Sequence, residues 1–179
     1  MRKRAEQPQT RRTSALSSRR SRPRLGWTVV RVVLRGQGGE ELTSPPGRDL
    51  LVSDTHTFED LAVAIDRAFA RWDLSHLHEF RLADGSRVGM IDPAGVDDDA
   101  PGLDERRLTL RQAGLRLGDS FEYVFDFGGS WEHLCSVLRD EVDPVRESGA
   151  SSPSDIVPLF GWGTIPDQYG RTTPNEDDE

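Results

Sequence analysis

The stretch that most constrains the fold runs from Phe121 to Leu138, with the sequence FEYVFDFGGSWEHLCSVL. Apolar and polar residues alternate on both sides of Gly128 and Gly129, as they do in strands with one buried face. Two adjacent glycines suit the positive φ values of a tight two-residue turn. The pattern therefore predicts an antiparallel β-hairpin that turns at Gly128 and Gly129.

The register of this hairpin decides which side chains share a face. A two-residue turn pairs Asp126 with Trp131, which places Asp126, Trp131 and His133 on one face. The other face then holds Phe125, Phe127 and Glu132. Diagonal neighbours across two strands lie roughly 7 to 8 Å apart, so the Asp126 carboxylate can orient the His133 imidazole. A one-residue bulge at the glycines would exchange the two faces.

The segments before the hairpin predict two strands and a helix. Trp27–Leu34 is rich in β-branched residues, and Asp49–Ser53 forms a second strand that pairs with it. Thr57 can cap a helix with Asp60 three residues later. A single apolar stripe follows at steps of three and four residues, and the helix is expected to end near Trp72. The stripe consists of Phe58, Leu61, Ala62, Ile65, Phe69 and Trp72.

The remaining segments predict short strands and loops. Leu77–Leu82 alternates as a half-buried strand does, with His78 on the face of Phe80, and a short strand follows at Arg87–Ile91. A short strand is also expected at Leu108–Gln112. Three polar or Gly/Pro-rich segments are predicted to be irregular: the acidic loop Asp92–Glu105, the connector Asp140–Asp155, and Val157–Gly170, which docks through its aromatic residues.

The order of these elements predicts an α+β fold in a single domain. It consists of a mixed sheet with one main amphipathic helix, in a β-grasp-like order, with Trp131–Leu138 as an added C-terminal strand. The domain is expected to span residues 25–170. Residues 1–24 form a predicted disordered basic tail, and residues 171–179 a predicted disordered acidic tail.

Charge is distributed unevenly along the chain. The net charge is -8, yet residues 1–24 carry about +8, which leaves about -16 on the remainder. An acidic domain repels phosphate backbones, so any contact with nucleic acid is expected through residues 1–24, with little sequence specificity. An inert extension is the alternative interpretation of this tail.

The composition also restricts the compartment and the type of site. The single cysteine, Cys135, can form neither an internal disulfide nor a multi-thiolate zinc site, which favours a reducing compartment. Neither a membrane-spanning run nor a secretory signal is present, so a cytoplasmic location and no membrane partner are expected.

The candidate chemistry rests on histidines and carboxylates. His78, Asp126, Glu132 and His133 are the candidate catalytic residues. His76, His78, Asp126 and His133 are the candidate metal ligands. The alternative is that each histidine hydrogen-bonds loop backbone around an aromatic core. No nucleophile elbow, phosphate loop or dinucleotide motif is present, and no cofactor is implied.

Two blocks resemble the signature of the plasmid pRiA4b ORF-3-like family, whose members are also described as passengers of insertion elements. The first block is WDLSHLHEF, Trp72–Phe80, and the second block is YVFDFGGSWEH, Tyr123–His133. The expected signature or structural positions are Trp72, Asp73, Phe80, Phe127, Gly128 and Trp131. The resemblance implies a fold and an association with mobile elements, but no defined activity.

The chain departs from the family pattern at two positions. Members of the family usually have Asp where this chain has Gly129. The segment Pro166–Gly170 resembles a Pro-Glu-Asp-Cys-Gly element in which Tyr169 replaces the cysteine. A thiolate metal site is therefore not expected in this chain.

Three functions remain open from the sequence. The first is a non-enzymatic binding or accessory module, possible for a compact acidic domain with aromatic blocks and no complete catalytic set. The second is a metal-dependent hydrolase that uses the His/Asp cluster. The third is a nucleic-acid-associated protein that acts through its Arg-rich tail.

Overall fold

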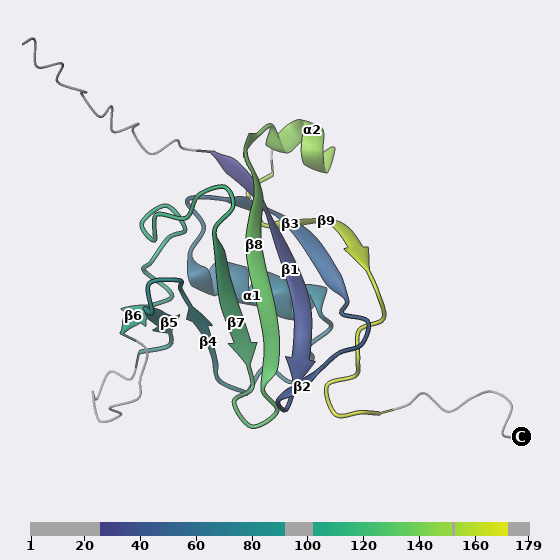
Figure 1. The fold of residues 1–179 in the computed structure, drawn as a ribbon. Helices are drawn as coiled ribbons and strands as arrows, with labels where there is room; N and C mark the ends of the chain where they lie inside the picture. The colour runs from purple at the N-terminus through teal and green to yellow at the C-terminus, as the bar shows by residue number, and fades with distance from the viewer. Residues whose placement is uncertain (1–25, 92–101, 152, 172–179) are drawn as a thin grey trace, which may run out of the picture.

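The fold was examined in a computed structural model, which describes residues 26–91, 102–151 and 153–171. The predicted basic tail, the predicted acidic tail after Arg171, and most of the predicted acidic loop lie outside these residues. In the described part, one large sheet carries helix α1 against one face (Figure 1). A mixed α+β fold in one domain is therefore confirmed.

Nine strands form the sheet in the described residues, in the order β6-β5-β4-β7-β8-β1-β3-β9, with β2 paired to β1. Only β5 and β6 pair in parallel, and the other pairs are antiparallel. The strands are β1 (Trp27–Gln37), β2 (Glu40–Glu41), β3 (Gly47–Ser53), β4 (His78–Arg81), β5 (Arg87–Gly89), β6 (Leu103–Asp104), β7 (Ser120–Phe125), β8 (Trp131–Val142) and β9 (Val157–Trp162).

Helix α1 (Phe58–Ala68) begins as the sequence predicts. The Thr57 hydroxyl accepts a hydrogen bond from the Asp60 amide at 3.1 Å, and the Asp60 carboxylate accepts one from the Thr57 amide at 2.9 Å. This capping box satisfies two amides that the first turn would otherwise leave unpaired. The buried stripe of α1 then packs on the sheet, and burial of each large apolar side chain contributes roughly 2 kcal/mol.

The end of α1 differs from the prediction. The helix stops at Ala68 with Phe69 as its C-cap, and Ala70 adopts a left-handed φ of 52°. Because of this turn, Arg71 and Trp72 do not continue the apolar stripe of the helix. Arg71 is consequently buried, whereas Trp72 is 50% exposed.

The added strand β8 lies in the middle of the sheet, between β7 and β1. Its buried residues alternate from Trp131 through His133 and Cys135 to Val137. The core cluster gathers Trp131 and Cys135 with side chains of β1, β3, β4, β7 and α1. The second block therefore lies at the centre of the fold, and the short helix α2 (Pro144–Ser148) follows β8.

The predicted register of the β7–β8 hairpin is wrong by one residue. Phe125 pairs with Trp131, and a five-residue loop from Asp126 to Ser130 replaces the two-residue turn. Phe125 and Trp131 are each 1% exposed. The predicted register would have placed them on opposite faces, with one of the two facing away from the core. Asp126 (φ 57°) and Ser130 (φ 45°) close the loop instead in left-handed conformations.

Four further segments differ from the prediction. Leu103 and Asp104 form β6 rather than loop, and Val157–Trp162 forms the edge strand β9, because its backbone pairs with β3. The predicted strand Leu108–Gln112 consists of turns, with one isolated bridge between Thr57 and Thr109. The predicted connector begins late, since β8 continues to Val142 and α2 follows.

Candidate functional site

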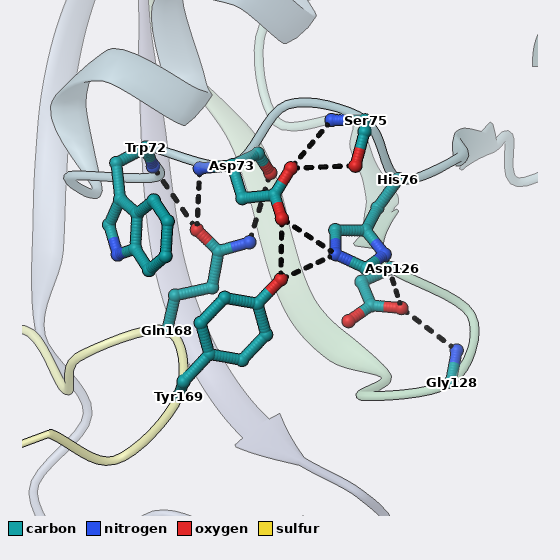
Figure 2. A network of polar contacts seen from close by, with 8 residues as sticks. All are labelled: Trp72, Asp73, Ser75, His76, Asp126, Gly128, Gln168 and Tyr169. Carbon is teal, nitrogen blue, oxygen red and sulfur yellow. Dashed lines mark hydrogen bonds and ion pairs between the residues drawn. The ribbon is translucent and has the colours of Figure 1, made fainter.

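The first block, the second block and the C-terminal residues meet at one end of the sheet. We call residues 163–171 the C-terminal strap. Figure 2 shows the side chains that join the three segments. His76 and Tyr169 lie at the centre of this polar network, with Asp73 and Asp126 on either side.

Tyr169 links the strap to the first block through its hydroxyl. It donates a hydrogen bond to Asp73 Oδ2 at 2.7 Å, and its oxygen lies 2.8 Å from His76 Nε2. Asp73 Oδ1 accepts two further hydrogen bonds from Ser75, from the hydroxyl at 2.6 Å and the amide at 3.1 Å. The hydrogen bonds from Ser75 and Tyr169 lower the pKa of Asp73 to about 2. The same Asp73 contact raises the pKa of the Tyr169 phenol.

Asp126 links the second block to the first. Its Oδ1 atom lies 3.3 Å from His76 Nδ1 and accepts a hydrogen bond from the Gly128 amide at 3.1 Å. The Asp126 amide donates to the Leu77 carbonyl at 2.9 Å. The left-handed turn at Asp126 thus directs its carboxylate toward His76 rather than toward His133.

The Gln168 side chain anchors the strap to the backbone of the first block. This side chain is 3% exposed, and its Oε1 atom accepts hydrogen bonds from the amides of Trp72 at 3.1 Å and Asp73 at 3.2 Å. Its Nε2 atom donates to the Asp73 carbonyl at 3.0 Å. One side chain therefore satisfies three backbone groups of the first block.

Large apolar side chains surround the network and stay in contact with solvent. The Trp72 and Tyr169 rings lie 5.1 Å apart, and each side chain is 50% exposed. Leu77 is 57% exposed, and Phe127 is 48% exposed. The backbone hydrogen bond between the Asp126 amide and the Leu77 carbonyl joins the segments that carry these two side chains. We call this set of exposed side chains the recognition surface: Trp72, Leu74, Leu77, Phe127 and Tyr169.

The predicted histidine cluster separates into three places. His76 contacts Asp126, as described above. His78 lies with its Nε2 atom 2.8 Å from Glu105 Oε2, at the end of the segment predicted to be a loop. Burial lowers the pKa of His78, but the hydrogen bond and charge of Glu105 outweigh burial, so the pKa is raised overall.

His133 is buried in the core, and the prediction that it lies beside Asp126 is wrong. Its Nδ1 atom lies 3.2 Å from the Tyr123 carbonyl, and its ring packs against Phe69 at 4.8 Å. Burial lowers the pKa of His133 to about 3, and the charge of Arg71 acts in the same direction. Its environment matches the alternative interpretation, in which a histidine hydrogen-bonds backbone.

The other predicted positions divide between core and surface. Glu132 is exposed and accepts a hydrogen bond from Ser130 at 3.1 Å. Phe80 and Trp131 belong to the core, whereas Phe127 is half-exposed. Gly128 supplies the backbone amide that binds Asp126.

Several residues of the site were not predicted from the sequence. Arg71 is buried over the Trp131 ring, and its Cζ atom lies 3.8 Å from the ring centroid. Asp66 accepts a hydrogen bond from the Tyr123 hydroxyl at 2.8 Å, and burial raises the pKa of Asp66 to about 6. Asp66 lies four residues after Ala62 on the buried face of α1, where a charged residue interrupts the apolar stripe, but nothing local in the sequence marks Gln168 or Glu105.

The network has limited catalytic capacity in this arrangement. A carboxylate, an imidazole and a phenol in series can hold a proton, but the raised pKa of Tyr169 disfavours a phenolate nucleophile. In the described residues, no group of three or more His, Cys, Asp or Glu side chains is placed to hold a metal ion. Three hollows of about 120 to 630 Å³ are lined by other residues than those of the network.

Neither helix in the described part of the chain has the length and apolar character that a bilayer span requires.

Part of the chain is similar to a curated protein. The protein named "Uncharacterized protein y4hQ" of Sinorhizobium fredii (strain NBRC 101917 / NGR234) is 42% identical over 69 residues. The match covers 38% of this chain and 34% of that protein, so the chain spans about a third of the length of the curated relative it matches.

A solved structure shows the same fold. It is the crystal structure of the protein of unknown function MM3350 from Methanosarcina mazei Go1, with a TM-score of 0.60 and 22% identity. The similarity covers 76% of this chain and 70% of that chain. At this identity the similarity is evidence for the fold alone.

The family model described as "Plasmid pRiA4b ORF-3-like protein" matches residues 40–153. The matched range includes both blocks in full and ends before the C-terminal strap. The chain belongs to the plasmid pRiA4b ORF-3-like family.

Proposed function

We propose that this chain is a non-enzymatic accessory module that binds a protein partner through the recognition surface. The observation that carries the proposal is the position of the five apolar side chains. They gather around a polar network at the junction of both blocks, and each is between 48% and 58% exposed.

The shape and composition of this surface favour a macromolecular partner. Exposed aromatic and aliphatic residues at one place typify protein interfaces, in which a few such anchors provide most of the binding energy. The three hollows described above are lined by other residues than the anchors. A small molecule is usually bound in a concave site that buries most of its area.

The charges indicate what kind of protein segment binds. Asp73, Asp126 and Asp167 lie in or beside the network, and Arg171 pairs with Asp167 at 2.9 Å. An excess of carboxylates at the edge of an apolar surface favours a partner with basic residues next to its apolar ones. We therefore infer that the partner segment is apolar with flanking Lys or Arg.

The family description points to the setting of this function. It names a reading frame of a plasmid, which supports an accessory protein carried by plasmids or other mobile elements. The absence of a defined reaction in the network supports binding rather than turnover, with the polar groups holding the two blocks and the strap in position.

A display selection tests the proposal. Random peptides are selected on the full chain, and their affinities are measured for the wild type and for Phe127→Ser. We expect peptides with apolar and basic residues, bound at least about tenfold more weakly by Phe127→Ser, which corresponds to about 1.4 kcal/mol. Phe160→Ser is the matched control, because Phe160 is 62% exposed on β9 and lies outside the recognition surface.

Two results would contradict the proposal. One is a selection that yields no peptide above the background of an unrelated protein. The other is a set of peptides that Phe127→Ser binds as well as the wild type while Phe160→Ser loses them.

A further inference from the structure

Arg71 is a buried cation with no hydrogen-bond partner in the described part of the chain. The residue is 5% exposed, and its Nε, Nη1 and Nη2 atoms all lack a partner among the described residues. Stacking on Trp131 at 3.8 Å attracts the guanidinium through its flat face. Stacking leaves the N–H groups in the guanidinium plane free to donate, and a buried donor is normally satisfied.

His133 provides a second buried group in the same place. Trp131 and His133 are two residues apart on the inner face of β8, and Arg71 lies over Trp131. Phe69, two residues before Arg71, packs on the His133 ring at 4.8 Å. His133 is 2% exposed, and its Nε2 atom also lacks a partner among the described residues. Arg71 and His133 therefore flank one region between the end of α1 and β8.

The hydrogen-bonding state of His133 follows from its other nitrogen. Nδ1 lies 3.2 Å from the Tyr123 carbonyl oxygen, which can only accept, so Nδ1 carries the proton. Burial lowers the pKa of His133 to about 3, which keeps the ring neutral at physiological pH. The Nε2 atom is therefore an acceptor that requires an O–H or N–H donor.

The nearby carboxylates do not neutralise Arg71 directly. Asp66 and Asp167 raise the pKa of Arg71 by their charge, although burial dominates and lowers that pKa to about 10. Neither forms an ion pair with Arg71 in the described residues; Asp66 accepts from Tyr123, and Asp167 pairs with Arg171. The region thus presents a cationic fork of donors beside one neutral acceptor.

We propose that Arg71 and His133 form a buried binding site for a small oxyanion that carries a hydroxyl group, such as hydrogen phosphate or bicarbonate. The oxygens of the anion accept from the guanidinium, the geometry in which arginine binds oxyanions best. The hydroxyl donates to His133 Nε2. The burial of both residues restricts the ligand to a few heavy atoms.

The strap is bound to the residues that follow Arg71 in the chain. Gln168 is buried against the backbone of Trp72 and Asp73, the two residues that follow Arg71. Release of these three hydrogen bonds would uncover the end of α1. The oxyanion site uses buried groups and does not depend on the recognition surface, so either proposal can fail without the other.

Phosphate and sulfate titrations of the full chain test the site. Calorimetry and thermal unfolding are followed with potassium phosphate at constant ionic strength, and with sulfate, which carries no hydroxyl at neutral pH. We expect phosphate to bind and raise the Tm, and sulfate to bind at least about tenfold more weakly. The absence of a phosphate effect, or equal effects of phosphate, sulfate and chloride, would overturn the proposal.

Variants then assign the binding to these residues. Arg71→Leu should abolish the phosphate effect, whereas Arg106→Leu should keep it, because Arg106 is exposed and pairs with Asp104 at 3.3 Å, outside the strap and the proposed site. If Arg71→Leu does not fold, ¹⁵N NMR of the wild type decides instead. Phosphate should shift the Arg71 Nε and His133 Nε2 resonances, and unchanged resonances would show that the groups are only hydrated.

Discussion

The Tyr169 hydroxyl donates a 2.7 Å hydrogen bond to Asp73 Oδ2 and so joins the C-terminal strap to a residue 96 positions earlier. The same oxygen lies 2.8 Å from His76 Nε2. A phenol that reaches both groups performs a cross-linking role in this chain. The strap, which lies beyond the range of the family match, is thereby fixed to the first block.

Replacement of Tyr169 by Phe should loosen the strap without unfolding the domain. The ring remains to pack on Trp72, but the hydrogen bonds to Asp73 and His76 are lost. Amide hydrogen exchange in residues 164–170 should become roughly tenfold faster, because local opening controls exchange there. Exchange in β8 should stay unchanged, and an equal acceleration in both segments would contradict the cross-link.

Replacement of Gly47 by Ala should destabilise the edge of the sheet. A Cβ atom on Gly47 would overlap the Trp162 indole, which is held by a hydrogen bond from its Nε1 atom to the Pro45 carbonyl at 3.2 Å. Overpacking of this kind costs about 2 kcal/mol in the free energy of unfolding, measurable by urea denaturation. Gly102→Ala is the control, since nothing lies within 4 Å of its added Cβ, and equal effects of the two changes would refute the explanation.

Asp66 should make stability fall as pH rises. Its pKa is about 6 in the folded chain and about 3.9 when unfolded, so the folded state binds more protons between these values. The free energy of unfolding should therefore fall by about 2 kcal/mol between pH 4 and pH 6 on account of this group. Asp66→Asn should remove that decrease in urea unfolding series, and wild-type and variant curves that run parallel would contradict it.

His133 should make the free energy of unfolding rise with pH, the opposite of the effect of Asp66. Its pKa is about 3 in the folded chain and about 6.5 when unfolded, so the unfolded state binds more protons in between. This group should lower the free energy of unfolding by about 4 kcal/mol as pH falls from 6.5 to 3. His133→Gln should make the free energy of unfolding depend less on pH between pH 6.5 and pH 3, whatever its effect on stability at neutral pH. If the free energy of unfolding falls as steeply in the variant as in the wild type over this pH range, other groups cause the fall.

The elements that the sequence predicted well are those with a strong local signal. The capping box at Thr57 and Asp60 and the β-branched run in β1 depend on neighbours in the chain, and both are present. The alternation in Leu77–Leu82 also predicted a half-buried strand, and Phe80 is buried in β4. These features need only the periodicity of helix and strand.

The hairpin loop shows where local signals are insufficient. Gly128 and Gly129 suit a two-residue turn, but Phe125 and Trp131 must face the same core, and their burial decides the register. The left-handed residues are Asp126 and Ser130, and neither glycine has a positive φ. The wrong register moved Asp126 from His76, its true neighbour, to His133.

The strap and the buried cation could not be predicted, because tertiary contacts define them. Gln168 binds backbone groups that lie 95 and 96 residues away, and Arg71 is buried only because α1 ends at Ala68. A helix extended to Trp72, as predicted, would have left no left-handed turn at Ala70. The candidate site is consequently half predictable: its two blocks are visible in the sequence, and the third segment is not.

The most direct measurement of the central claim is NMR chemical-shift mapping of a selected peptide on the ¹⁵N-labelled chain. The account predicts that the largest shifts fall on Trp72, Leu74, Leu77, Phe127 and Tyr169. Shifts concentrated instead around the cavity of about 320 Å³ lined by Trp27 and Leu115 would contradict it.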